Sequence, residues 1–193
     1  SDSALRESLG LGATESGGKR LAETVLQPAL NLRGLSSGAV ADKAFYERLF
    51  ARARRYGWLV LSDEAYSEIW FTPTAPPSAL EVAKEGCLAF FSMSKRSAMT
   101  GWRVGWVCAP APILEGIVKV HQYGIMSAPT VAQDAALVAL RDGDPAVEAM
   151  VAEYDRRRRL LVDGLNRLGL PTFEPRGAFY AFPRIASTGL DDE

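Results

Sequence analysis

The sequence predicts an α/β fold, because short apolar runs are interspersed with longer stretches that favour helices. The runs at 58–61 and 87–91 are apolar throughout, which is typical of strands buried on both faces of a parallel sheet. Four longer stretches favour helices: 43–56, 111–123, 130–140 and 145–168. Strands and helices mixed in this way along a chain are typical of α/β domains.

The first 38 residues are rich in glycine and serine and only weakly periodic. We expect a leader or a remnant of a larger domain, with a short helix at 19–30. The segment from Gly12 to Lys19 nearly matches a nucleotide-binding Gly-x-x-x-x-Gly-Lys loop. Gly18 breaks its spacing, however, and Arg20 stands where a serine or threonine is needed, so we reject that interpretation.

The predicted helix at 43–56 has signals at both ends. Asp42 precedes it, and an aspartate there can accept a hydrogen bond from a free N–H group in the first turn. Gly57 follows the last residue, where a glycine commonly ends a helix. Arginines cover one face, and the opposite face is apolar: Phe45, Leu49, Phe50 and Ala53.

The middle of the chain predicts further elements in a regular order. We expect a proline-rich loop at 71–78, a short helix at 79–85, strands at 87–91 and 103–108, and helices at 111–123 and 130–140. Pro145 begins the last and longest helix, because proline is tolerated in a first turn, and Gly169 ends it. Its expected apolar stripe is Val147, Met150, Val151, Tyr154, Leu161 and Leu165.

Lys95 is the strongest chemical signal in the chain. It follows the strand at 87–91, with Ser92 and Ser94 before it and Arg103 among glycines after it. A lysine amine can form a Schiff base with a carbonyl compound. Pyridoxal phosphate (PLP) is such a compound, and its sites need a lysine, phosphate ligands and an acidic partner for the ring nitrogen.

Asp63 is the candidate for that acidic partner. It falls where the strand at 58–61 ends, and ligands of open α/β sheets gather outside the carboxyl ends of the strands. A carboxylate there can keep a pyridine nitrogen protonated. Tyr66, three residues later, can donate a hydrogen bond to the phenolic oxygen of the cofactor.

Together these motifs resemble those of the class I/II aminotransferases, the fold-type I PLP enzymes. The resemblance covers about residues 36–183 and includes Pro175-Arg176-Gly177-Ala178-Phe179-Tyr180, which is similar to the segment that opens the small domain in that family. The sequences of residues 66–71 and 94–97 resemble those of a narrower branch of the family, which includes the succinyldiaminopimelate aminotransferases. The resemblance implies a Schiff-base role for Lys95, a pyridinium contact for Asp63, a phenol contact for Tyr66 and phosphate contacts for Ser92, Ser94 and Arg103.

The resemblance also implies a fold and a domain division. We expect an incomplete three-layer α/β/α large domain with a mostly parallel sheet, followed by the start of a small α+β domain. The large-domain core would span 39–145, the interdomain helix 146–168 and the start of the small domain 169–193, with 1–38 poorly defined.

Three departures from the family pattern concern activity. Family members are about twice as long, so the chain is expected to be a shortened one. Leu35 stands where the family has an asparagine, and leucine can neither donate nor accept a hydrogen bond. Neither the family's carboxylate-binding arginine nor the tyrosine borrowed from a dimer partner has a counterpart here. We therefore expect low activity from this chain alone.

Composition excludes several other classes of function. The net charge is −1, which gives no overall attraction to nucleic acid or to an anionic membrane, and no apolar run approaches the roughly 20 residues that span a bilayer. Arg156–Arg159 points round most of a helix, so we expect ion pairs with Glu148, Glu153 and Asp155 instead of a nucleic-acid site. The single histidine, His121, offers no metal site. The two cysteines, Cys87 and Cys108, are expected to be buried thiols, and the cytoplasm is the expected compartment.

Each candidate residue also has a plain structural alternative. Lys95 alone would be a surface lysine, Asp63 a turn cap, Tyr66 a core residue and Arg103 one half of an ion pair. Their combination favours a PLP-dependent transaminase, acting on an amino acid and a 2-oxo acid as a homodimer. The alternatives are another PLP reaction, such as β-elimination, and a truncated or non-catalytic PLP-binding module.

Overall fold

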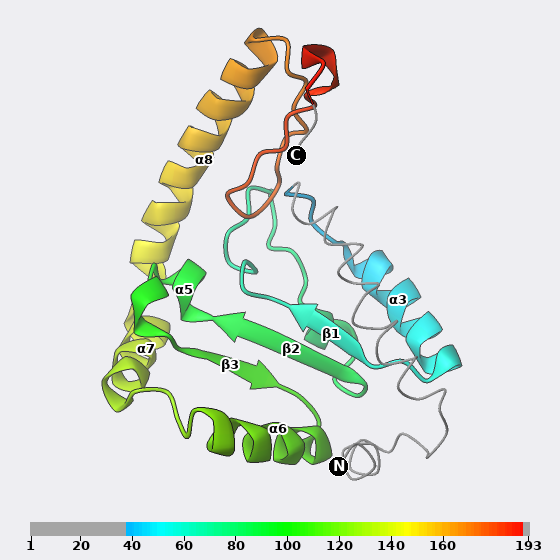
Figure 1. Cartoon of the computed structure of the whole chain (residues 1–193), viewed down its shortest axis with the longest axis vertical. Helices are drawn as coiled ribbons and strands as arrows, with labels where there is room; N and C mark the ends of the chain where they lie inside the picture. Colours follow the sequence, from blue (N-terminus) through cyan, green and yellow to red (C-terminus); the bar gives the residue numbers. More distant parts are fainter. Residues whose placement is uncertain (1–37, 191–193) are drawn as a thin grey trace.

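The computed structural model describes residues 38–190 of the chain. The expected helix at 19–30 and the Leu35 position lie outside these residues. In chain order the elements are α3 (Lys43–Tyr56), β1 (Val60–Asp63), α4 (Ala79–Val82), β2 (Cys87–Ser92), α5 (Met93–Arg96), η1 (Thr100–Trp102), β3 (Gly105–Cys108), α6 (Ala111–Gly124), α7 (Thr130–Asp142), α8 (Asp144–Arg167) and η2 (Ala186–Thr188), as drawn in Figure 1.

The predicted ends of α3 are confirmed. The Asp42 carboxylate accepts a 2.7 Å hydrogen bond from the Phe45 N–H, as an N-cap does. Gly57 lies in the left-handed region at φ +66° and reverses the chain into β1. On the inner face of the helix, Phe50 and Ala53 are buried, so the capping signals and the apolar face together determine this element.

The sheet has the order β1-β2-β3. β1 and β2 are parallel, with Val60 opposite Cys87 and Asp63 opposite Phe90. β3 runs antiparallel to β2, so this part of the sheet is mixed, where a mostly parallel one was expected. The reason is the compact α5–η1 connection, which turns the chain back beside β2 without the helical crossover that a parallel neighbour needs. The predicted α/β class is confirmed.

Two apolar clusters hold the helices to the sheet. In the first, Phe50 and Ala53 of α3 pack with Val60, Ala79 and Cys87, which joins α3 and α4 to β1 and β2. In the second, Met93, Met99 and Ala136 join α7 to the turn that follows β2. The second cluster lies directly beside Lys95 in the sequence and therefore supports the segment that carries it.

The predicted long helix is confirmed as α8, with one correction to its apolar stripe. Leu161 is 51% exposed, whereas Val162 is 7% exposed. A helix has 3.6 residues per turn, so positions 161 and 162 lie about equally far from the centre of the face that holds Val147, Val151 and Tyr154. Helical periodicity alone therefore does not decide which of the two is buried. Position 158 is an arginine whose side chain is 13% exposed, and its presence there concealed the register of the stripe.

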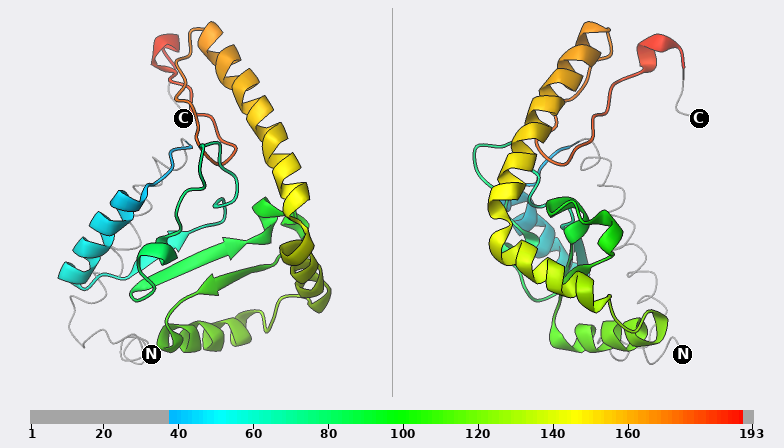
Figure 2. Two further views of the ribbon diagram at one scale, coloured as in Figure 1. Left: turned by 180° about the vertical axis from the view of Figure 1, so that it is seen from behind. Right: turned by 90° about the vertical axis from the view of Figure 1, so that its left-hand side faces the viewer.

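The chain after α8 returns towards the sheet, as Figures 1 and 2 show in orange and red. Gly177 pairs with Trp70 in an isolated antiparallel bridge. Hydrogen bonds from Arg176 N to Gly38 O (2.7 Å) and from Ala178 N to Ile69 O (2.8 Å) complete the contact. This return brings residues 176–180 beside the loop that follows β1. The domain division stated above stays a prediction.

The arginine run on α8 is paired with acids, as predicted. Arg156 and Arg157 contact Glu153, and Arg158 and Arg159 contact Asp155. Glu174, in the returning segment, is a further partner of Arg158. Glu148 forms no ion pair within residues 38–190.

Candidate functional site

Lys95 lies one turn beyond the carboxyl end of β2, in the short helix α5. Its amine is 5.3 Å from the ring centroid of Tyr66 and 5.3 Å from that of Phe179. Ammonium groups at this distance from an aromatic face are attracted to it. The two rings come from segments more than a hundred residues apart. Their centroids are 5.2 Å from each other, so the rings pack together and the amine lies against both of them.

Tyr66 and Tyr180 connect these two segments directly. Their hydroxyl groups share a hydrogen bond, and Phe179 packs edge-on against Tyr66 with ring centroids 5.2 Å apart. Hydrogen bonding to Tyr66 raises the pKa of Tyr180, and burial adds to that effect. The nearby Lys95 charge lowers the same pKa, whereas the Asp63 charge raises it. Both charges therefore act on the Tyr180 phenol.

Asp63 and Glu64 are adjacent carboxylates with opposite surroundings. Asp63 ends β1 and is exposed, and its Oδ1 atom accepts a 3.0 Å hydrogen bond from Ala65 N. Glu64 is buried and accepts hydrogen bonds from Ser62 Oγ (3.0 Å), Ser78 Oγ (3.1 Å) and Ala79 N (3.0 Å). The hydrogen bonds of Glu64 therefore stabilise the start of α4, whereas the Asp63 carboxylate stays exposed and available to a ligand.

Ser92, Ser94 and Arg103 come together through the α5–η1 turn. Ser92 Oγ accepts from Ser94 N at 3.2 Å, and Thr100 Oγ1 donates to Ser94 O at 3.1 Å. Arg103 NH1 donates to Thr100 O at 2.8 Å. Within residues 38–190 this carbonyl is the one hydrogen-bond partner of the guanidinium, which leaves its remaining N–H groups able to bind an anion.

Backbone strain is concentrated in the same region. Ala98 and Arg103, both at φ +53°, flank η1, and Ala178, at φ +57°, precedes Phe179. A left-handed conformation is uncommon for residues other than glycine, and it persists where the surrounding contacts enforce it. Three of the four such residues in the described chain therefore belong to the two segments that carry Lys95 and Phe179.

Sequence reasoning missed Phe179 and Tyr180 as members of this cluster. They belonged to the motif that supported the family resemblance, and no local pattern showed which side chains they would meet. Gly38 allows the returning segment at 175–178 to pack closely against the start of the described chain. Its φ is +81°, and a Cβ atom there would stand 2.4 Å from Pro175 Cβ, so only glycine permits this approach of the returning segment.

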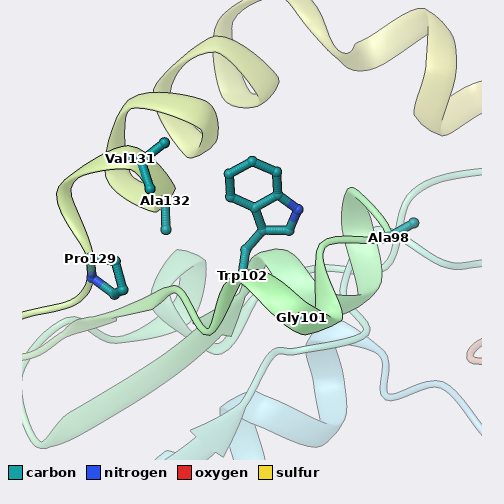
Figure 3. A pocket seen from close by; sticks show the side chains of 6 residues that line it. All are labelled: Ala98, Gly101, Trp102, Pro129, Val131 and Ala132. Atoms are coloured by element: carbon teal, nitrogen blue, oxygen red, sulfur yellow. The ribbon is translucent and has the colours of Figure 1, made fainter.

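A shallow hollow of about 330 Å³ lies on the other side of η1 (Figure 3). The Trp102 indole projects into it, beside Pro129 and the side chains of Val131 and Ala132 at the start of α7. The lining includes neither Lys95 nor Asp63 nor Tyr66, so the chemical groups of the site are not in this hollow. In the part of the chain that the structure describes, no three His, Cys, Asp or Glu side chains are placed to hold a metal ion.

Comparisons with known proteins identify the family. The model of the family described as aminotransferase class I and II matches residues 36–192. The aspartate aminotransferase of Pyrococcus abyssi is 42% identical over 158 residues, which are 80% of this chain and 41% of that protein. The LL-diaminopimelate aminotransferase of Desulforudis audaxviator is 41% identical over 158 residues, covering 81% of this chain and 40% of that protein.

A solved structure gives the same result for the fold. The aromatic aminotransferase of Pyrococcus horikoshii matches with a TM-score of 0.76 and 41% identity, over 79% of this chain and 42% of that one. The chain thus spans about two fifths of the length of the proteins it resembles.

Proposed function

Because this chain belongs to the class I and II aminotransferase family, we propose that it carries the cofactor centre of a PLP-dependent transaminase. Such an enzyme transfers an amino group between an amino acid and a 2-oxo acid. The observation that carries the proposal is the position of the Lys95 amine. It lies just beyond the carboxyl end of β2, 5.3 Å from the centroid of the Tyr66 ring. The neighbouring strand, β1, ends at Asp63.

The side chains at this edge of the sheet have the chemistry that PLP requires. The Lys95 amine would hold the aldehyde carbon, and the Asp63 carboxylate would face the pyridine nitrogen. The Tyr66 hydroxyl would donate to the phenolic oxygen. The phosphate would be bound by Ser92, Ser94 and Arg103. The planar guanidinium of Arg103 can donate two parallel hydrogen bonds to a phosphate group. When bound, PLP supplies a ring that accepts electrons from the substrate.

The residues of the chain then have distinct tasks. Lys95 Nζ, once its amine is free, can take up and return a proton beside the reacting carbon as general base and acid. Asp63, held by the Ala65 N–H, presents a fixed negative charge to a ring nitrogen and so favours its protonated form. Tyr66 is oriented by its contact with Tyr180. The proposal therefore assigns proton transfer to Lys95 and charge stabilisation to Asp63.

The names of the relatives support amino-group transfer over β-elimination. Those quoted above are called aspartate, LL-diaminopimelate and aromatic aminotransferases. Because these names differ in substrate, the proposal stays with the class of an amino acid and a 2-oxo acid. Membership of the succinyldiaminopimelate branch and a cytoplasmic location remain predictions. No helix among residues 38–190 is both long and apolar enough to cross a membrane.

A homodimer is part of the proposal. Large apolar side chains are exposed along α6 and the turn after it, including Tyr123 at 94% and Met126 at 79%, and exposed apolar patches mark surfaces that another protein covers. Sedimentation velocity of the purified chain is expected to show a dimer. If the chain stays monomeric at all concentrations up to about 100 µM, which would detect even a weak dimer, the homodimer is contradicted.

Cofactor binding is the direct test of the proposed centre. Titration of the purified chain with PLP is expected to produce a near-ultraviolet or visible absorbance band that borohydride fixes to Lys95, as peptide mass spectrometry would show. Lys95→Ala is expected to lose the band, with Lys84→Ala as the matched control. An unchanged spectrum in Lys95→Ala would refute the assignment. Binding is the quantity to measure because the chain spans only about two fifths of the length of its relatives, and turnover can depend on parts that it does not match.

A further inference from the structure

Arg96, the residue after Lys95, is a buried charge at the junction of three segments. It is only 7% exposed. Its Nε atom lies 2.7 Å from both carboxylate oxygens of Glu68. Its NH1 group donates to Ala139 O at 3.0 Å, and its NH2 group contacts Asp144. A buried arginine with two carboxylate partners is a costly arrangement that persists only when its geometry is well satisfied.

The partners of Arg96 belong to the segments that surround the Lys95 amine. Glu68 follows Tyr66 by two residues in the loop after β1. Asp144 begins α8, the helix whose Tyr154 packs on the ring of Phe179 with centroids 5.5 Å apart. One guanidinium therefore ties the turn that carries Lys95 to the segments that support the two rings beside its amine.

We propose that Arg96 is a positioning residue, which holds the α5 turn so that the Lys95 amine stays against the rings of Tyr66 and Phe179. The role of the amine itself rests on the proposed function. A lysine at 96 could not replace the arginine, because an ammonium group is a compact charge that cannot present a planar fork of donors to three partners. Removal of the guanidinium frees the turn to rotate, and Lys95 moves with it.

The first test requires no cofactor. Brief competitive acetylation, read by peptide mass spectrometry, measures the reactivity of Lys95 relative to the surface lysines Lys84 and Lys119. In Arg96→Met the ratio of Lys95 to Lys119 labelling is expected to change at least threefold, and Arg96→Lys is expected to behave similarly. Phe50→Ala is the control, because it weakens the α3 core without touching the site.

The second test uses PLP as the probe. The rate at which the borohydride-fixable adduct forms at Lys95 is expected to fall about tenfold in Arg96→Met and to stay within about twofold of wild type in Phe50→Ala. Wild-type labelling ratios and adduct rates in Arg96→Met would overturn the proposal. If the wild-type chain forms no adduct, the proposed function fails, and the acetylation ratio still decides the role of Arg96.

A more conservative variant guards against a failure to fold. Glu68 is 45% exposed, so Glu68→Gln removes the charge of one partner without leaving an empty space in a core. Its Lys95 labelling ratio is expected to shift in the same direction as in Arg96→Met. An unchanged ratio in a folded Glu68→Gln protein would contradict the proposal.

Discussion

At the scale of single residues, the neighbours Asp63 and Glu64 show how one strand end serves two purposes. Successive side chains of a strand point to opposite sides, so one carboxylate faces the site and the other enters the interior. Glu64 is acceptable there because three donors satisfy it. Its charge also affects the interior. Burial raises the pKa of Tyr46 to about 12 and that of Cys87 to about 11, and Glu64 adds to both shifts.

These shifts predict a loss of stability in alkali. Tyr46 keeps its proton more tightly in the folded chain than in the unfolded one, where its pKa would be 10.0. Its contribution is therefore complete below pH 10 and is lost as pH rises through about 12. The free energy of unfolding, measured by urea denaturation, is expected to fall less steeply over this window in Tyr46→Phe than in wild type. Equal slopes would show that Tyr46 ionises freely in the folded chain.

At the scale of elements, α8 shows how an apolar stripe can be hidden by a charged residue. Arg158 occupies a position on the buried face by laying its stem along the protein, with its guanidinium carbon 5.0 Å from the Phe71 ring centroid. Its head group is satisfied by Asp155, Glu174 and the Pro175 carbonyl. Because an arginine normally indicates the solvent side, the sequence alone does not show that the buried stripe passes through position 158 to Val162.

The corrected register is testable with two matched variants. Val162→Ala removes two buried methyl groups and is expected to lower the free energy of unfolding by about 1.6 kcal/mol. Leu161→Ala removes more atoms from an exposed site and is expected to change it by less than about 0.5 kcal/mol. Chemical denaturation of both variants decides the register. A larger loss in Leu161→Ala would restore the original stripe.

At the scale of the whole molecule, the site depends on the return of the chain after α8. Residues 176–178 bond to Gly38 and Ile69, and this contact delivers Phe179 and Tyr180 to Lys95. The segments that meet are more than a hundred residues apart in the chain. The cluster therefore depends on α8, which carries the chain away from the sheet before residues 176–180 return to it (Figure 1).

A glycine substitution tests this dependence. Gly38→Ala would place a Cβ atom 2.4 Å from Pro175 Cβ at φ +81°, so it is expected to cost more than about 1 kcal/mol of stability and to weaken PLP binding. Gly164→Ala, inside α8 with open space around it, is the control and is expected to stabilise the chain by up to about 1 kcal/mol. Normal PLP affinity in Gly38→Ala would show that the return of the chain is dispensable for cofactor binding.

The sequence by itself determined the α/β class, the ends of α3 and the existence of the long helix, and it predicted that Lys95 lies near Tyr66. These follow from local causes: capping groups, periodicity, and the placing of side chains at the ends of neighbouring strands. Only the tertiary structure decided that β3 is antiparallel, that Phe179 and Tyr180 meet Tyr66 beside the lysine, and that Arg96 joins three segments. Each of these depends on contacts between residues far apart in the chain, and local patterns carry no information about which distant surfaces will meet.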